Sequence, residues 1–269
     1  LLTQAVEIGV VRITIVSPNS VHPELEDVLR ERLGLSNVIV AHVEDDSEES
    51  ALSAIGSAGA SYLEATLSET DCIGLSSWSS TLLAVVEAMA PGLVKAKEIV
   101  QIQGGVGNPT AQVQATRLTD RFAAVTGGTA KYLAAPGVVA NKAVREGLFQ
   151  DPYISQVAED WNQLSVALLG IGALQPSKLL KDSGNTLSDD DLQSLSQASA
   201  IGDVCLHYFD QDGLPVESAL DDRVIAISAG QLRSIPRRIG IAGGKRKVEA
   251  ILAAAKGKWI DVLITDSIT

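Results

Sequence analysis

Short runs of aliphatic residues recur along the whole chain, and stretches with helical periodicity separate them. Such runs predict buried strands, because a strand covered on both faces of a sheet needs no polar face. Strands that alternate with helices indicate a parallel sheet, since each helix carries the chain back to the start of the next strand. The runs predict strands at Val10–Val16, Val38–Val43, Cys72–Leu75, Glu98–Ile102, Tyr132–Ala134, Val166–Leu169, Val224–Ile227, Ile239–Ala242 and Ile260–Ile264.

The intervening stretches space their apolar residues three and four positions apart, which is typical of helices that bury one face. Gly34 is expected to end the first of these helices. Apolar residues make up 46% of the chain but aromatic residues only 4%, which favours an aliphatic α/β core over an aromatic-rich β-sandwich. The periodicity predicts helices within His22–Leu35, Leu52–Leu67, Leu82–Ala90, Thr110–Val125, Asn141–Gly147, Asp151–Trp161, Ala229–Arg233 and Lys245–Ala255.

The middle of the chain has a different character. Gln175–Ser199 is polar and predicts a loop with one short helix near the mouth of a pocket. Asp203–Asp210 and Pro215–Ser218 then flank Gln211-Asp212-Gly213, and Asp-Gly between apolar runs is typical of a hairpin turn. We therefore expect one α/β domain over residues 1–269, in which a parallel sheet between helices carries a small antiparallel lobe.

The charge balance is acidic, with 21 basic and 33 acidic residues and a formal net charge of −12. Such a surface repels a polyphosphate backbone, so the chain alone is not expected to bind DNA, whereas a local cationic pocket for one small phosphorylated ligand is compatible with it. Cys72 and Cys205 lack CxxC spacing, which predicts buried reduced thiols. No apolar run approaches the roughly 20 residues of a membrane span, and Leu1–Val11 lacks a basic signal-peptide region, so a cytoplasmic protein away from membranes is expected.

The segment Cys72–Val86, CIGLSSWSSTLLAVV, is the most informative junction. A buried strand breaks into small hydroxylated residues, and a helix begins at once. Doubly wound sheets bind ligands at the carboxyl ends of their strands, and free amides at a helix N-terminus attract anions. Ser79, Ser80 and Thr81 therefore predict an anion cradle, while the alternative that they only cap the helix is equally compatible with the sequence.

Two glycine-rich junctions follow the same plan. In Gln101–Thr110, QIQGGVGNPT, the glycines allow a ligand to approach the backbone, and Gln103 is a hydrogen-bonding candidate; a tight turn without a ligand is the alternative. In Gly240–Ile251, GIAGGKRKVEAI, three cations open the last expected helix. Cations there oppose the helix dipole, so a bound anion is favoured over a solvated lysine pair. Three such junctions predict one shared polar pocket.

Catalytic groups are scarce. His22, His42 and His207 are scattered and lie outside the glycine-rich junctions, and no His/Cys/Asp grouping has the spacing of a metal site. Asp203, which follows a glycine at the start of an expected strand, is the best polar candidate and can accept hydrogen bonds from sugar hydroxyls. A capping or turn role for Asp203 is the alternative. No cofactor is expected.

Taken in order, these segments resemble the sugar-binding domain of SorC/DeoR-type transcriptional regulators, over nearly the whole chain. The resemblance implies a Rossmann-like fold similar to ribose-5-phosphate isomerase and glucosamine-6-phosphate deaminase. It also implies a phosphorylated sugar or polyol effector and a homo-oligomer, either dimer or tetramer. DNA would be bound only by an N-terminal helix-turn-helix module preceding Leu1, and a further helix would follow Thr269. The stretches that carry the resemblance are GVVRITIVSPNSVHPELEDVLRERLGL, IGLSSWSSTL, QIQGGVGNPTAQVQATRL, GDVCLHYFDQDGLPV, LDDRVIAISAGQLRSIPRRIGIAGGKRKVEAI and IDVLITD.

The resemblance assigns site residues one by one. The Ser-Ser-Thr run corresponds to the phosphate grip, Asp203 to the acidic residue facing sugar hydroxyls, and Lys247 to the lysine at the last Gly-Gly loop. Gln103 stands where some members have Arg or Lys, so it implies neither a Schiff base nor a second phosphate site. The expected ligand-binding residues are Ser77, Trp78, Ser79, Ser80, Thr81, Gln103, Gly104, Gly105, Gln114, Asp203 and Lys247.

Two other functions are compatible with this fold. An aldose–ketose isomerase or amino-sugar phosphate deaminase needs a group that moves a proton next to a carbonyl, and Asp203, its single attractive candidate, lacks a convincing partner. A module that only oligomerises is the other. We therefore expect a sensor that is not an enzyme.

Overall fold

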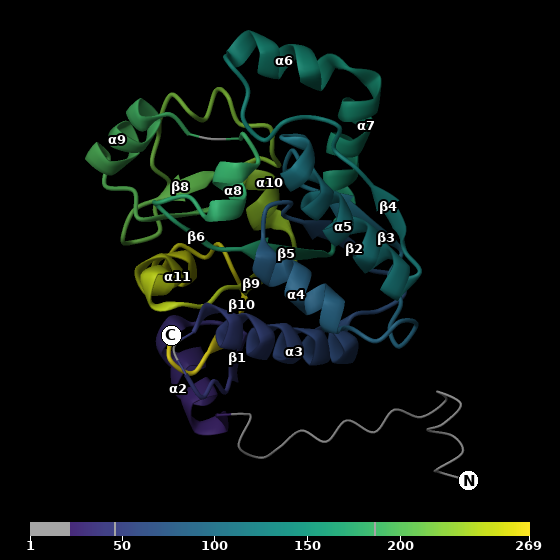
Figure 1. The fold of residues 1–269 in the computed structure, drawn as a ribbon, viewed down its shortest axis with the longest axis vertical. Coiled ribbons are helices and arrows are strands. Elements are labelled where there is room, and N and C mark those ends of the chain that lie inside the picture. The colour runs from purple at the N-terminus through teal and green to yellow at the C-terminus, as the bar shows by residue number, and fades with distance from the viewer. Residues whose placement is uncertain (1–21, 46, 186) are drawn as a thin grey trace.

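A seven-stranded, wholly parallel sheet forms the centre of the molecule in a computed structural model, which describes residues 22–45, 47–185 and 187–269 (Figure 1). The strand expected at Val10–Val16 lies outside these residues. The strand order is β1-β10-β9-β5-β2-β3-β4. The strands are β1 (Asn37–Ala41), β2 (Cys72–Leu75), β3 (Glu98–Gln101), β4 (Thr129–Lys131), β5 (Val166–Gly170), β9 (Arg237–Ile241) and β10 (Val262–Asp266).

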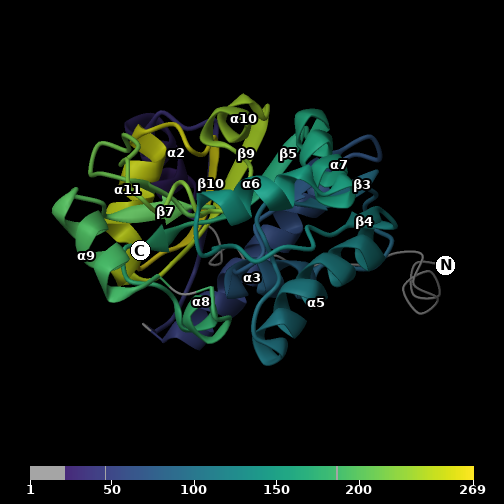
Figure 2. The ribbon, with the colours of Figure 1, turned by 90° about the horizontal axis from the view of Figure 1, so that it is seen from above.

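Helices cover both faces of the sheet, because neighbouring strand residues point to opposite sides. In β2, for example, Ile73 and Leu75 pack into one apolar cluster and Cys72 into the other. The first cluster lies under α3 (Glu48–Thr66), α4 (Ser80–Ala88) and α5 (Pro109–Thr126), and Figure 2 shows α3 and α5 on the side opposite α7 and α10. The second lies under α2 (Pro23–Leu33), α6 (Lys142–Gln150), α7 (Pro152–Asp160), α10 (Ala229–Ser234) and α11 (Val248–Lys256).

The strand order changes direction at β2 and β5. The chain runs outward from β2 to β3 and β4, then returns to place β5 between β2 and β9. At such a reversal, the loops at the carboxyl ends of neighbouring strands diverge and leave a crevice. The topology therefore sets the position of a cavity before any side chain is considered.

A small antiparallel sheet and two helices form the expected lobe beside α11 (Figure 1). Its strands are β6 (Gly172–Ala173), β7 (Gly202–Val204) and β8 (His207–Phe209). The expectation of one short helix in the polar middle was wrong, since α8 (Lys178–Asp182) and α9 (Asp189–Gln197) both form there, each capped by a serine. The serines supply the capping oxygens that let such short, polar helices begin.

The strand expected over Asp203–Asp210 is broken in two. Cys205 and Leu206 adopt φ of 52° and 64° and turn the chain sharply between β7 and β8. The expected reversal at Gly213 also exists, with φ of 74° and an antiparallel bridge between Phe209 and Pro215. The first turn lacks the Gly or Asn typical of positive φ, which is why the sequence did not indicate it.

Other elements also depart from the sequence prediction in position or type. The strand expected at Tyr132–Ala134 is β4, three residues earlier, because an edge strand is half exposed and carries polar residues. Val224–Ile227 is buried but forms only isolated bridges, through Val224 to Val138 and through Ala226 to Gln103, instead of a strand. The helix expected from Lys245 begins at Val248, after a 3₁₀ turn over Lys245–Lys247.

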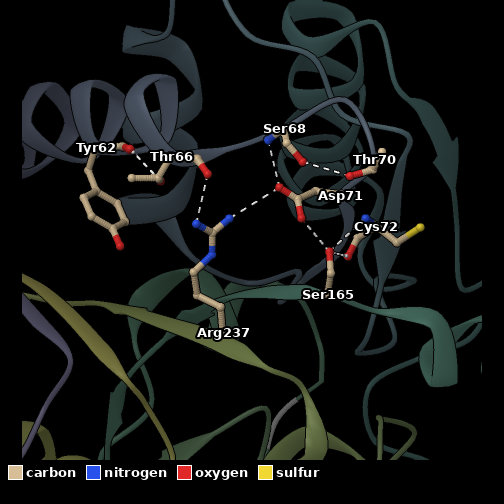
Figure 3. Close-up of polar contacts among 8 residues, drawn as sticks. All are labelled: Tyr62, Thr66, Ser68, Thr70, Asp71, Cys72, Ser165 and Arg237. Atoms are coloured by element: carbon tan, nitrogen blue, oxygen red, sulfur yellow. Dashed lines mark hydrogen bonds and ion pairs between the residues drawn. The ribbon is translucent and has the colours of Figure 1, made fainter.

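The amino ends of the central strands are tied together by a polar network (Figure 3). The Asp71 carboxylate accepts hydrogen bonds from the Ser165 hydroxyl at 2.7 Å and the Ser68 amide at 2.8 Å, and lies 3.4 Å from the Arg237 guanidinium. Arg237 also donates to the Thr66 carbonyl at the end of α3, at 3.0 Å. This network joins β2, β5, β9 and α3 at the amino ends of the strands, opposite the crevice.

Among the described residues, no helix combines the length and the apolarity that crossing a bilayer requires.

Candidate functional site

A cavity of about 640 Å³ lies at the carboxyl edge of the sheet. The segments that follow β1, β2, β3, β5 and β9 contribute to its wall, together with the last residue of β10 and part of the lobe. It brings together seven of the residues expected from the sequence, namely Trp78, Ser79, Ser80, Thr81, Gln103, Asp203 and Lys247. The prediction that several strand ends meet at one cavity is thus confirmed for the junctions after β2 and β9. The cavity wall combines these polar groups with apolar side chains such as Ile55 and Ile171.

The junction after β2 presents the N-terminus of α4 to this cavity. The hydroxyl oxygen of Ser79 accepts from the Leu82 amide at 3.2 Å, so Ser79 is the N-cap residue, as the capping alternative stated. The amides of Ser80 and Thr81 precede the first intrahelical bonds and have no backbone acceptor in the described chain. The site therefore offers free N–H groups, neighbouring hydroxyls and the positive end of a helix dipole.

Asp203 reaches the cavity from β7 of the lobe. Its carboxylate accepts from the Leu206 amide at 2.9 Å, which helps to hold the turn after β7. A Cβ on Gly172, in the paired strand β6, would lie 1.9 Å from Asp203 Oδ1, so the carboxylate fits only beside glycine. Burial raises the pKa of Asp203 to about 6, although the Leu206 amide and the Lys247 ammonium group both act to lower it.

Lys247 enters from the 3₁₀ turn after β9. Burial and the neighbouring charge of Arg246 lower its pKa, while Asp203 and Glu48 act in the opposite direction. The ion pairs within 4 Å in the described part of the chain do not include one between Asp203 and Lys247. The two charges therefore face the same cavity without neutralising each other in direct contact.

Gln103 lies at the other end of the wall, after β3. It is only 5% exposed, and its backbone carbonyl accepts from the Ser77 hydroxyl at 2.7 Å, whereas its side-chain amide has no partner among the described residues. Trp78 lines the cavity as well, and its indole N–H donates to the Gly104 carbonyl at 2.8 Å. Ser77 and Gly104 thus support the wall from behind.

The glycine-rich loop after β3 has a different role from the one expected. A Cβ on Gly104 would lie 2.2 Å from the Pro136 carbonyl oxygen, and one on Gly107 would lie 2.2 Å from the Ser183 carbonyl oxygen. The close approach is therefore to the chain itself, and Gly104 and Gly105 lie outside the cavity wall. Gln114 lies on α5, and its side chain is outside the described part of the structure.

The segment that includes α8, from Gln175 to Asp182, forms one side of the cavity, so the polar middle lies at the pocket mouth as expected. The sequence did not single out any individual residue of this segment as a site residue. Asp266, the last residue of β10, forms another side. Asp266 could have been identified from the sequence, because it is an acidic residue at the carboxyl end of the apolar run 262–265.

Histidines lie outside the described wall of the cavity. His207 Nε2 lies 2.7 Å from the Ile227 carbonyl oxygen, burial lowers the His207 pKa, and the ring stacks on Trp259. His22 and His42 contact each other at 3.2 Å. Asp203 therefore has no imidazole beside it for proton transfer.

A parallel sheet that gathers polar groups at its carboxyl edge, beneath a small lobe, defines a ligand-binding α/β domain. A family model described as "Putative sugar-binding domain" matches residues 18–269. The deoxyribonucleoside regulator of Bacillus subtilis (strain 168) is 30% identical over 269 residues, which cover 100% of this chain and 85% of the relative. The chain therefore belongs to the sugar-binding domain family of SorC/DeoR-type transcriptional regulators, which confirms the resemblance and the fold class.

Solved structures agree with this assignment. The full-length sorbitol operon regulator SorC from Klebsiella pneumoniae has a TM-score of 0.83 at 26% identity, with 99% of this chain and 85% of that chain covered. A structure from Pseudomonas syringae pv. tomato, described as "Putative sugar-binding domain of transcriptional regulator DeoR", is 39% identical with a TM-score of 0.71, over 91% of this chain and 95% of that one. The chain is thus the sugar-binding domain of a transcriptional regulator.

Proposed function

We propose that this domain senses a phosphorylated sugar or polyol in the cytoplasm and adjusts DNA binding by rearranging a homo-oligomer, a dimer or a tetramer. DNA contact is made by a separate helix-turn-helix module of the regulator, because a domain with a net charge of −12 repels the duplex. The observation that carries the proposal is the shared cavity of the α4 N-terminus, Asp203 and Lys247.

The groups around the cavity suit the two ends of a phosphorylated sugar. The free amides of Ser80 and Thr81, with the Lys247 ammonium group, favour an anion. Asp203 and the unpartnered amide of Gln103 are hydrogen-bonding groups for hydroxyls. The names of two relatives, deoxyribonucleoside regulator and sorbitol operon regulator, also favour a sugar or polyol.

The domain acts as a sensor, not as an enzyme, in this proposal. Isomerisation or deamination would need a second proton-transfer group paired with Asp203. The described wall contains no histidine, and no ion pair within 4 Å joins its Lys247 to Asp203 in the described residues. Ligand binding then shifts the equilibrium toward the oligomeric arrangement that binds the ligand more tightly, and DNA affinity changes through linkage. Turnover of ribose 5-phosphate or glucosamine 6-phosphate in a coupled assay would favour the enzyme instead.

Thermal melting with matched pairs of ligands tests the proposal. The panel contains sugar and polyol phosphates, each beside its unphosphorylated form. A ligand at 100 times its dissociation constant stabilises the folded state by about 2.7 kcal/mol, and only phosphorylated members are expected to do so at low concentration. A panel without any shift would argue strongly against the sensor.

Lys247→Gln supplies the site-specific arm of this experiment. Losing a charged hydrogen bond of about 1.5–3 kcal/mol weakens binding by roughly tenfold or more. Lys256→Gln is the matched control, because Lys256 ends α11, is exposed and pairs with Asp212 outside the cavity. Equal affinities in the two variants would show that Lys247 does not meet the ligand.

A further inference from the structure

The carboxylate of Asp266 occupies a position that simple electrostatics does not favour. The residue ends β10, is 2% exposed and forms part of the cavity wall. A fixed negative charge there repels a bound anion, the class of ligand for which Lys247 and α4 are suited. Its presence therefore needs a reason other than direct contact with the anion.

Both oxygens of this carboxylate accept hydrogen bonds from the chain. Oδ1 accepts from the amides of Ile268 at 3.0 Å and Thr269 at 2.8 Å. Oδ2 accepts from the Gly244 amide at 3.2 Å and the Thr269 hydroxyl at 2.6 Å. The Gly244 amide also donates to the Thr269 hydroxyl oxygen at 2.7 Å, so it is held from two sides.

The turn that Asp266 holds can be formed only by glycines. A Cβ on Gly243 would lie 2.2 Å from Asp266 Oδ2 and 2.4 Å from Ile55 Cδ1. Gly244 has φ of 100° and ψ of 136°, a backbone conformation that residues other than glycine rarely adopt. The Gly244 carbonyl in turn accepts from the Lys247 amide at 2.9 Å and closes the 3₁₀ turn. Asp266 is thus connected to Lys247 through Gly244, whose N–H donates to Asp266 and whose carbonyl accepts from Lys247.

We propose that Asp266 is a positioning residue for anion binding: by fixing Gly244 it shapes the turn that carries Lys247 into the cavity. This inference rests on the proposed function, since it requires Lys247 to meet an anion. The carboxylate acts through the backbone, and its hydrogen bonds to four donors offset the repulsion it would exert on the ligand.

Inorganic phosphate is the probe for this inference, with binding to the whole domain measured by calorimetry. Loss of a negative charge alone would tighten phosphate binding, whereas loss of the positioning contact weakens it. We expect Asp266→Asn to lower phosphate affinity about tenfold, because the amide group places a donor where Gly244 and Thr269 also donate.

Asp261→Asn is the matched control. Asp261 precedes β10 at the amino edge of the sheet, where it binds Arg238, and it lies outside the cavity wall. The substitution removes the same charge from the opposite end of the same strand, so it controls for the change in net charge of the domain. We expect it to lower the melting temperature and leave phosphate affinity unchanged.

A double-mutant cycle separates positioning from general loss of structure. Gly244→Ala should weaken phosphate binding like Asp266→Asn, and the double variant should bind no more weakly than either one, because both disrupt the same turn. Gly244→Ala also provides the test if Asp266→Asn fails to fold. Thr81→Val, on the other side of the cavity, should add to either variant.

The outcomes distinguish this inference from the function on which it rests. Wild-type binding of phosphate with equal or tighter binding by Asp266→Asn would overturn the positioning role and leave the sensor intact. Additive effects of Asp266→Asn and Gly244→Ala would overturn it as well. A wild-type domain that binds neither phosphate nor any phosphorylated sugar would overturn the proposed function itself.

Discussion

Glycine at several positions makes room for another part of the chain instead of supplying a left-handed turn. Gly257 has φ of −74°, while the next residue, Lys258, takes the left-handed conformation with φ of 54°. A Cβ on Gly257 would lie 2.2 Å from the Gly213 carbonyl oxygen, which explains why glycine stands one position before the turn that favours it. Sequence patterns predict turns at glycines, but such close approaches depend on distant segments and cannot be inferred locally.

Lys258→Gly should stabilise the domain by about 0.5–1 kcal/mol, because it relieves the cost of a left-handed L-residue at an exposed site. Gly257→Ala should instead destabilise the domain by more than about 1 kcal/mol, since its methyl group meets the Gly213 backbone. Urea unfolding of the two variants measures both effects. The same sign of change in both would contradict this account.

The stability of the domain should depend on pH through Asp203. Because burial raises its pKa in the folded protein to about 6, from an ordinary value of 3.8, the folded chain holds the proton more tightly than the unfolded chain. The stability linked to this proton is present at low pH and is lost as the pH rises through about 6. Relative to Asp203→Asn, the wild type should lose on the order of 1 kcal/mol of unfolding free energy between pH 5 and 8. If the unfolding free energies of the two proteins changed equally with pH, the raised pKa of Asp203 would be refuted.

At the scale of secondary structure, the sequence predicted elements whose signal is local. The helix before Gly34 and the strand Cys72–Leu75 were predicted closely, because a cap and an apolar run define them. Elements defined by a distant partner were not predicted correctly. The position of β4 is determined by its pairing with β3, and the bridges at Val224 and Ala226 join segments far apart in the chain. Side-chain pattern alone does not encode such pairing.

Arg237→Gln tests the network at the amino edge of the sheet. It leaves the Asp71 carboxylate with fewer donors and removes the link from β9 to α3, so we expect a loss of about 1–3 kcal/mol of stability. Ligand affinity should be unchanged, because this edge lies opposite the cavity. Arg30→Gln, which breaks an exposed pair with Asp27, should cost less than about 0.5 kcal/mol and serves as the comparison.

At the scale of the whole molecule, the sequence predicted the strand-end residues of the cavity, Asp203 and the general position of the polar middle, but not the individual wall residues around α8. Strand-end junctions carry recognisable serine and glycine signals, so Ser79–Thr81 and Lys247 were expected. The wall formed by α8 depends on how Asn185 binds the backbone of Val106 and Gly137, contacts between segments far apart in the chain. Tertiary packing of that kind leaves no periodic trace in sequence.

The net charge leads to one prediction for the entire domain. A chain with a charge of −12 should show no retention of duplex DNA in a gel-shift assay at about 50 mM salt, where weak electrostatic attraction would be strongest. Polylysine, mixed with the same DNA, confirms that the assay detects attraction. DNA retention by this domain alone would show that it carries a nucleic-acid surface of its own.

The sheet is fastened at one edge by the Asp71–Arg237 network and open at the other, and this asymmetry affects how ligand preference can diverge. Substitutions around the cavity leave the Asp71–Arg237 network intact. Ligand preference can therefore change during evolution while the sheet remains folded. A combinatorial library confined to the open edge should accordingly yield mostly folded proteins, whereas one confined to the fastened edge should yield few.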